Sequence, residues 1–220
     1  MIEYAHLVAK ELQKRGIEFN SQFSEIEQLI LYPAEQFGEL LGRPANEVVY
    51  VYVIILSFVC SLLLSLVASP FLRKLLSVVM GVAIQLNFLG ASFLLNVPLS
   101  VTCWLSMCIF PRNTQHYVTI FVTFSIMTLL HLYYELIETV DLNMSAISMV
   151  SFCKQMSLAL NYKDGDKDNQ KKLTPRETTM MVQERPGLLT YLAYMFFPAQ
   201  AVSGPFSEFV PFEKYINLEE

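Results

Sequence analysis

The sequence predicts an all-α, polytopic transmembrane protein. Hydrophobic residues make up 54% of the chain and charged residues only 16%, whereas a soluble domain usually carries about 25% charge. Residues free of Asp, Glu, Lys and Arg form four long runs, at 48–72, 75–111, 116–134 and 187–207. Because a helix needs about 20 apolar residues to cross a bilayer core of ~30 Å, we expect about five to six membrane segments.

The first region, residues 1–47, is expected to form short amphipathic helices. Phe19, Phe23, Ile26 and Ile30 recur at helical spacing. Such a helix either lies in the membrane interface or packs on the rest of the protein. The region has no apolar signal-peptide core, so the first span is expected to act as the targeting signal.

The second region, residues 48–220, is expected to be one transmembrane helical region. Its first four spans are expected at 48–69, 75–90, 92–110 and 116–134. Pro70 ends the first span, and Pro98 is expected to kink the third.

The later segments are less regular. Residues 142–161 are a weaker apolar segment that contains Lys154 and that either spans the membrane or is re-entrant. Residues 162–186 are expected to form a charged, solvated loop. The last apolar stretch, 187–210, is broken by Pro198 and by the Gly204–Pro205 pair.

The distribution of basic residues predicts an orientation. If all segments cross, Arg73, Lys74, Arg112 and the basic residues between 163 and 185 fall on one side. The positive-inside rule places that side in the cytoplasm and the N-terminus in the lumen or outside.

Lys154 is the most informative single charge. A lysine at mid-membrane depth costs about 2.5–3.5 kcal/mol, so it normally faces a polar cavity or partner, although snorkelling from a short helix is the alternative. A helix broken at membrane depth is tolerated where its freed backbone is buried or lines a cavity. Together these features predict a polar substrate chamber, with candidate residues Lys154, Gln155, Gln200, Ser203, Gly204, Pro205 and Glu208.

Other chemistries find little support. No cluster of Lys and Arg is interleaved with aromatics, so no nucleic-acid partner is expected. Four cysteines lie in apolar segments without metal-ligand spacing, so no metal site is expected. His131 is interpreted as a hydrogen-bonded interface histidine, with proton handling as the alternative.

Three stretches resemble the membrane-bound O-acyltransferases, and most closely their lysophospholipid acyltransferase branch. The first is KQMSLA at 154–159, followed by Asp164-Gly165. The second is RPGLLTYLAY at 185–194. The third is Gly204-Pro205-Phe206, leading to Phe212 and Tyr215.

The chain departs from the family pattern at two positions in the second stretch. Thr190 stands where the family usually has Glu, and Gly187 where it usually has Ser.

The resemblance implies transfer of a fatty acyl group from acyl-CoA, as co-substrate, to a lysophospholipid hydroxyl in the endoplasmic reticulum, with no bound cofactor. The family's catalytic His, and the Asn upstream of it, would lie beyond Glu220, and His131 does not fill that role. The 220-residue chain is therefore expected to be the N-terminal part of such an enzyme and inactive alone.

Two other functions stay open at this point. A buried lysine and broken helices also suit a transporter or channel component. A non-catalytic protein that binds membrane lipid is the other alternative. The sequence alone does not indicate the lipid head group, the acyl chain or the oligomeric state.

Overall fold

The computed structural model describes residues 42, 45–89, 93–136, 142–166, 173–202 and 206–219. The described residues are helical and include no β-strand. The expected amphipathic helices of residues 1–44 lie outside the described residues, apart from Gly42.

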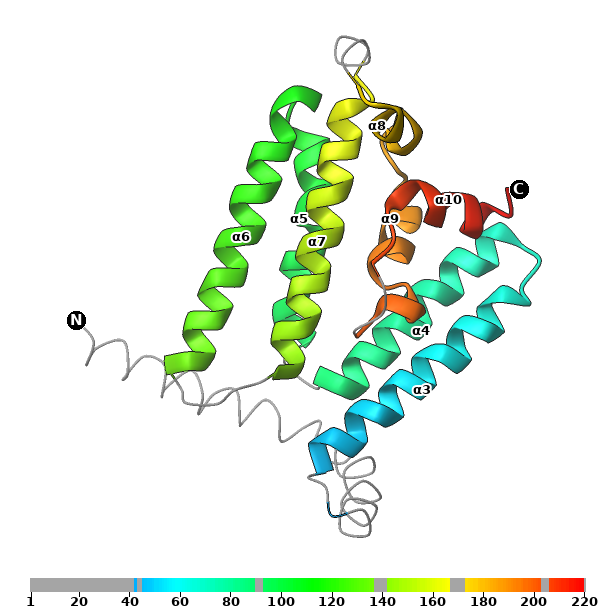
Figure 1. Cartoon of the computed structure of the whole chain (residues 1–220), viewed down its shortest axis with the longest axis vertical. Coiled ribbons are helices and arrows are strands. Elements are labelled where there is room, and N and C mark those ends of the chain that lie inside the picture. Colours follow the sequence, from blue (N-terminus) through cyan, green and yellow to red (C-terminus); the bar gives the residue numbers. More distant parts are fainter. Residues whose placement is uncertain are drawn as a thin grey trace.

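Two long helices form a hairpin at one side of the molecule (Figure 1). Helix α3 spans Ala45–Ser65 and α4 spans Pro70–Leu89, and they pack along each other. Pro70 begins α4, where its missing N–H is not needed. The second span was expected at 75–90, but helix α4 already begins at Pro70, so Arg73 and Lys74 lie in its first turns.

Arg73 is only 4% exposed despite its charge. Its guanidinium donates to the carbonyl oxygens of Ser65 at 2.9 Å, Val67 at 3.1 Å and Tyr215 at 2.7 Å. A planar guanidinium with five donors can serve several carbonyls at once. Arg73 therefore joins the end of α3 to α10, which spans Phe209–Asn217.

Three further helices stand side by side: α5 (Phe93–Ile109), α6 (Arg112–Leu136) and α7 (Leu142–Asp164) (Figure 1). Arg112 begins α6 and donates to the carbonyl oxygens of Tyr162 at 2.5 Å, Gln183 at 2.9 Å and Val182. This contact fixes the start of α6 against the end of α7.

The last apolar stretch is broken into short elements between these two groups of helices. Helix α9 spans Leu188–Met195, and the 3-10 helix η3 spans Pro198–Gln200. Helix α8, which spans Pro175–Met180, precedes this stretch and lies in the segment that was expected to be a charged loop. Helix α9 packs closely on α4, because Gly81 lacks a side chain: a Cβ there would lie 1.6 Å from the carbonyl oxygen of Phe196. Nearby, the Ser77 hydroxyl donates to the Ala193 carbonyl at 3.0 Å.

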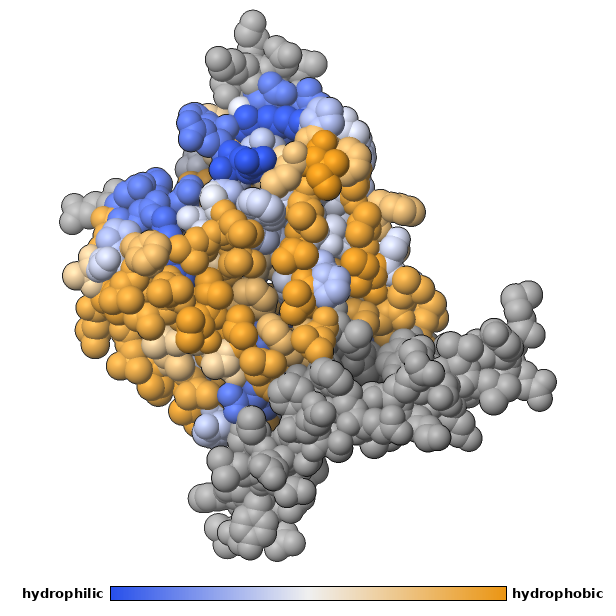
Figure 2. Space-filling view, turned by 180° about the vertical axis from the view of Figure 1, so that it is seen from behind, coloured by the Kyte–Doolittle hydropathy of each residue, from blue (hydrophilic) through white to orange (hydrophobic). Residues whose placement is uncertain are grey.

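Three of the described helices are long and apolar enough to cross a membrane: Val48–Ser65, Pro70–Leu89 and Arg112–Leu132. A shorter apolar helix covers Asn96–Ile109. At 23 residues, α7 is about 34 Å long, but its polar residues keep it below the hydropathy of a clear span. Figure 2 shows that the surface agrees with these apolar helices: hydrophobic residues cover the middle of the molecule, and hydrophilic ones gather toward its upper end.

The helices alternate in direction. In Figure 1 the α5–α6 turn and α8 lie at the top, and the α3–α4 turn lies at the right, at the upper end of its tilted hairpin. These segments contain or adjoin the basic residues that the sequence analysis assigned to one side. Which side of a membrane they face stays a prediction.

Candidate functional site

Lys154 lies fully buried on α7 and contacts the end of α9. Its ammonium donates to the carbonyl oxygens of Tyr194 at 2.9 Å and Met195 at 3.3 Å. A helix normally satisfies the Tyr194 carbonyl through the N–H four residues later, but that residue is Pro198. The carbonyl keeps a longer bond from the Phe197 N–H at 3.4 Å, and the lysine supplies the shorter one in place of the donor four residues later. Its amino group also lies at the negative end of the α9 dipole.

Tyr194 connects this lysine to the segment before α10. The Lys154 ammonium lies 5.2 Å from the centre of the Tyr194 ring, and the Tyr194 hydroxyl donates to the Ser207 carbonyl at 3.0 Å. The Ser207 hydroxyl bonds to Gln200 Nε2 at 2.6 Å. Lys154 and Gln200, two of the predicted chamber residues, thus belong to one polar network.

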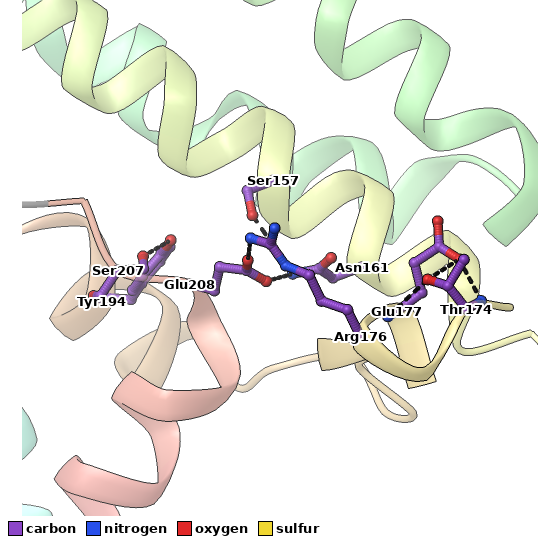
Figure 3. Close-up of polar contacts among 8 residues, drawn as sticks. All are labelled: Ser157, Asn161, Thr174, Arg176, Glu177, Tyr194, Ser207 and Glu208. Carbon is purple, nitrogen blue, oxygen red and sulfur yellow. Dashed lines mark hydrogen bonds and ion pairs between the residues drawn. The ribbon is translucent and has the colours of Figure 1, made fainter. Parts of the chain in front are cut away.

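Glu208, which follows Ser207, binds residues from two other helices (Figure 3). One carboxylate oxygen forms an ion pair with Arg176 of α8 at 2.9 Å. The other accepts a hydrogen bond from Asn161 Nδ2 of α7 at 3.2 Å. Because both oxygens have partners, the carboxylate is held in one orientation between α7 and α8.

Gln155 faces a different neighbour, helix α5. Its side-chain oxygen accepts a hydrogen bond from the backbone N–H of Cys103 at 3.0 Å. Its Nε2 is buried and has no hydrogen-bond partner among the described residues. The side chain of Gln115 on α6 donates to Ala159 of α7 at 2.7 Å. Polar side chains therefore join α5, α6 and α7 across their apolar contact.

A pocket of about 570 Å³ lies beside Glu208, between α7, α8 and the segment that precedes α10. One part of its lining is apolar, with Met156, Leu160, Met180 and Phe206. The other part is polar and includes Ser157, Asn161, Arg176, Glu177 and Glu208. A cavity with both kinds of lining suits an amphipathic molecule.

Helix α8 contributes Arg176 and Glu177 to the pocket lining, and its start is fixed by a cap. Thr174 and Glu177 form a capping box, in which each side chain bonds to the other's backbone N–H, and Pro175 occupies the first turn. The hydrogen bonds from the Thr174 backbone and hydroxyl lower the pKa of Glu177, so its carboxylate is charged at neutral pH.

The structure distributes the predicted chamber residues in three ways. Glu208 lines the pocket, whereas Lys154 and Gln200 lie behind it in the Tyr194 network. Gln155 faces away, toward α5. Ser203, Gly204 and Pro205 lie outside the described residues.

Sequence reasoning missed Arg176, Asn161 and Ser157 as site residues. Arg176 was assigned to a solvated loop, although Thr174 and Glu177, three residues apart with Pro175 between them, are the signal of a helix start. His131 lies on α6 and does not line the pocket. Among the described residues, no group of three or more His, Cys, Asp and Glu could hold a metal ion.

Comparison with known proteins gives one match. The chain is 34% identical over 84 residues to a lysophospholipid acyltransferase of Saccharomyces cerevisiae. The aligned part makes up 37% of this chain and 13% of that relative, so the chain spans only a small part of the relative's length. No family model matches the chain, and no solved structure matches it.

Proposed function

We propose that this chain is part of a membrane-embedded acyltransferase that transfers a fatty acyl group from acyl-CoA to a lysophospholipid hydroxyl. The similarity to an enzyme named for this activity carries the proposal. The amphipathic pocket beside Glu208 supports it, because an acceptor with one acyl chain and a polar head needs both kinds of surface.

In this proposal the described residues hold the acceptor rather than activate it. Lys154 and Tyr194 fix the broken helix, and Glu208 fixes the distance between α7 and α8. A histidine that acts as general base on the acceptor hydroxyl, together with an asparagine, is proposed to follow C-terminal to Glu220. Holding acceptor and acyl-CoA in reacting geometry would supply a large part of the rate enhancement.

The test is acyl transfer by membranes from cells in which the gene is intact or disrupted. Acyl-CoA and a lysophospholipid are supplied, and the diacyl product is quantified by mass spectrometry. Disruption is expected to lower the rate, and an unchanged rate for every lysophospholipid would contradict the proposal.

The 220-residue chain, expressed in the disrupted cells, is expected not to restore the rate. Restoration would place the catalytic group within these residues, with His131 the first to be replaced. Specific lipid binding with no gene-dependent turnover would instead favour the non-catalytic lipid-binding alternative.

A further inference from the structure

The pocket beside Glu208 contains charges of both signs. Arg176 contributes one positive charge, and Glu177 and Glu208 contribute two negative charges. The pocket lining therefore has an excess of one negative charge. Arg176 and Glu177 lie on α8, and Arg176 forms an ion pair with Glu208.

Arg176 keeps most of its hydrogen-bonding capacity. Its side chain is 81% exposed, and among the described residues only Nη2 is engaged, by Glu208. Nε and Nη1 form no hydrogen bond with the described residues. A guanidinium with two free nitrogens is well suited to a phosphate group, because it can donate to two oxygens at once.

The two carboxylates differ in their remaining capacity. Both oxygens of Glu208 have partners, and its side chain is only 16% exposed. In Glu177 one oxygen, Oε2, accepts both bonds from Thr174, while Oε1 has no hydrogen-bond partner among the described residues. Glu177 therefore offers a free, charged oxygen one position along the chain from the phosphate-binding candidate Arg176.

An apolar surface leads from this charged group along α7. Met149, Cys153, Met156 and Leu160 recur at spacings of four, three and four residues, so they share one face of the helix. Met149 is 50% exposed, and Cys153 and Met156 are exposed as well. This stripe covers about 16 Å along the helix axis and ends at the pocket, where Cys153, Met156 and Leu160 are lining residues.

We propose that the pocket binds the head group of a zwitterionic single-chain phospholipid, with Arg176 on the phosphate, Glu177 on the ammonium group, and the acyl chain along the stripe of α7. This inference rests on the proposed function and specifies its acceptor. The negative excess disfavours head groups that carry phosphate without an ammonium group, because these bring the same anion but no cation to offset the charge of Glu177.

The test uses the purified 220-residue chain in micelles of a non-ionic maltoside. A lysophosphatidylcholine with a photoreactive acyl chain is cross-linked to it, and the labelled residues are mapped by mass spectrometry. Labelling is expected on the α7 stripe and near Phe206. Unlabelled lysophosphatidylcholine and lysophosphatidylethanolamine are expected to compete about tenfold better than lysophosphatidylglycerol or lysophosphatidate of the same chain length, the effect of one charge-assisted contact.

Charge-neutralising variants sharpen the result. Glu177→Gln keeps a capping-box side chain and is expected to reduce the preference for zwitterionic lipids severalfold, and Arg176→Gln is expected to weaken competition by all phospholipids. Glu184→Gln, an exposed change outside the pocket lining, is the matched control and should leave the preference unchanged. The unfolding temperature of each variant shows that it is folded.

Equal competition by all lysophospholipids, or labelling confined to other helices, would overturn the inference. These outcomes are separable from a failure of the proposed function. Gene-dependent acylation without head-group preference at this pocket would contradict only the inference of zwitterionic head-group binding. A selective pocket without gene-dependent acylation would contradict only the proposed acyltransferase function.

Discussion

The ammonium of Lys154 lies 2.9 Å from the carbonyl oxygen of Tyr194, which Pro198 leaves without its usual backbone donor. The two features compensate each other: the proline leaves this buried carbonyl with only a long bond from the Phe197 N–H at 3.4 Å, and a lysine from another helix supplies a shorter one. This accounts for a fully buried lysine without any carboxylate beside it in the described contacts.

Replacing Lys154 with Met is expected to destabilise the fold. The change leaves the carbonyl of Met195 without its lysine donor, and the carbonyl of Tyr194 with only the 3.4 Å bond from the Phe197 N–H. The cost is about 1–3 kcal/mol for a buried unsatisfied group. The measurement is the thermal unfolding midpoint in detergent. Lys214→Met, at an exposed position of α10, is the control. Equal midpoints for the two variants would show that the buried contacts contribute nothing.

Gly81→Ala is expected to disrupt the packing of α4 on α9. The added Cβ would lie 1.6 Å from the carbonyl oxygen of Phe196, a backbone atom that cannot simply rotate away. Overpacking of this kind typically costs about 1–3 kcal/mol. Gly187→Ala is the comparison, since a Cβ there meets no atom within 4 Å. A lower unfolding midpoint for the Gly81 variant alone is the expected outcome.

Arg73→Lys is expected to lower the unfolding midpoint although the charge is kept. One ammonium cannot reproduce the planar set of donors that reaches Ser65, Val67 and Tyr215. Arg185→Lys, at an exposed position, is the control. If both variants unfold at the parent temperature, charge alone matters at position 73.

Thr174→Ala is expected to loosen α8 at neutral pH, because it removes one side of the capping box. Hydrogen exchange of the α8 amides is the measurement, and Thr179→Ala in the same helix is the control. At pH 7 exchange should be several-fold faster in Thr174→Ala only.

The pH dependence of this effect has a defined sign. The pKa of Glu177 is lowered in the folded protein from its ordinary 4.5, so the stabilisation by Glu177 is present above that value. It is lost as the pH falls through the lower folded value. The difference between the parent protein and Thr174→Ala should therefore narrow in acid, after correction for the intrinsic exchange rate, to the part due to the Glu177 N–H to Thr174 hydroxyl bond. A difference that stays undiminished there would contradict a role for the Glu177 charge.

Much of the fold was predictable from composition. Charge-free runs located α3 to α6, and the position of Pro198 correctly marked a break before η3. The helix ends were predicted less accurately. Arg73 lies inside α4, and its hydrogen bonds to backbone carbonyls permit its burial. Helix periodicity contains no information about such a distant partner.

The candidate site was only partly predictable. Lys154 and Glu208 were identified because charge near apolar stretches is costly. Asn161 and Arg176 were not, because they meet Glu208 across 47 and 32 positions of the chain. Contacts of this kind arise from the packing of α7, α8 and the segment before α10, and no local pattern indicates them.

The hydrogen bond between Arg73 and Tyr215 also constrains the order of biosynthesis. The two residues are 142 positions apart, and the ribosome makes the N-terminal partner first. Arg73 therefore leaves the ribosome before Tyr215, its third acceptor, exists. The contacts of this guanidinium are completed late in synthesis, so ribosome-bound chains that stop before α10 should hold the α3–α4 hairpin less tightly than the released protein.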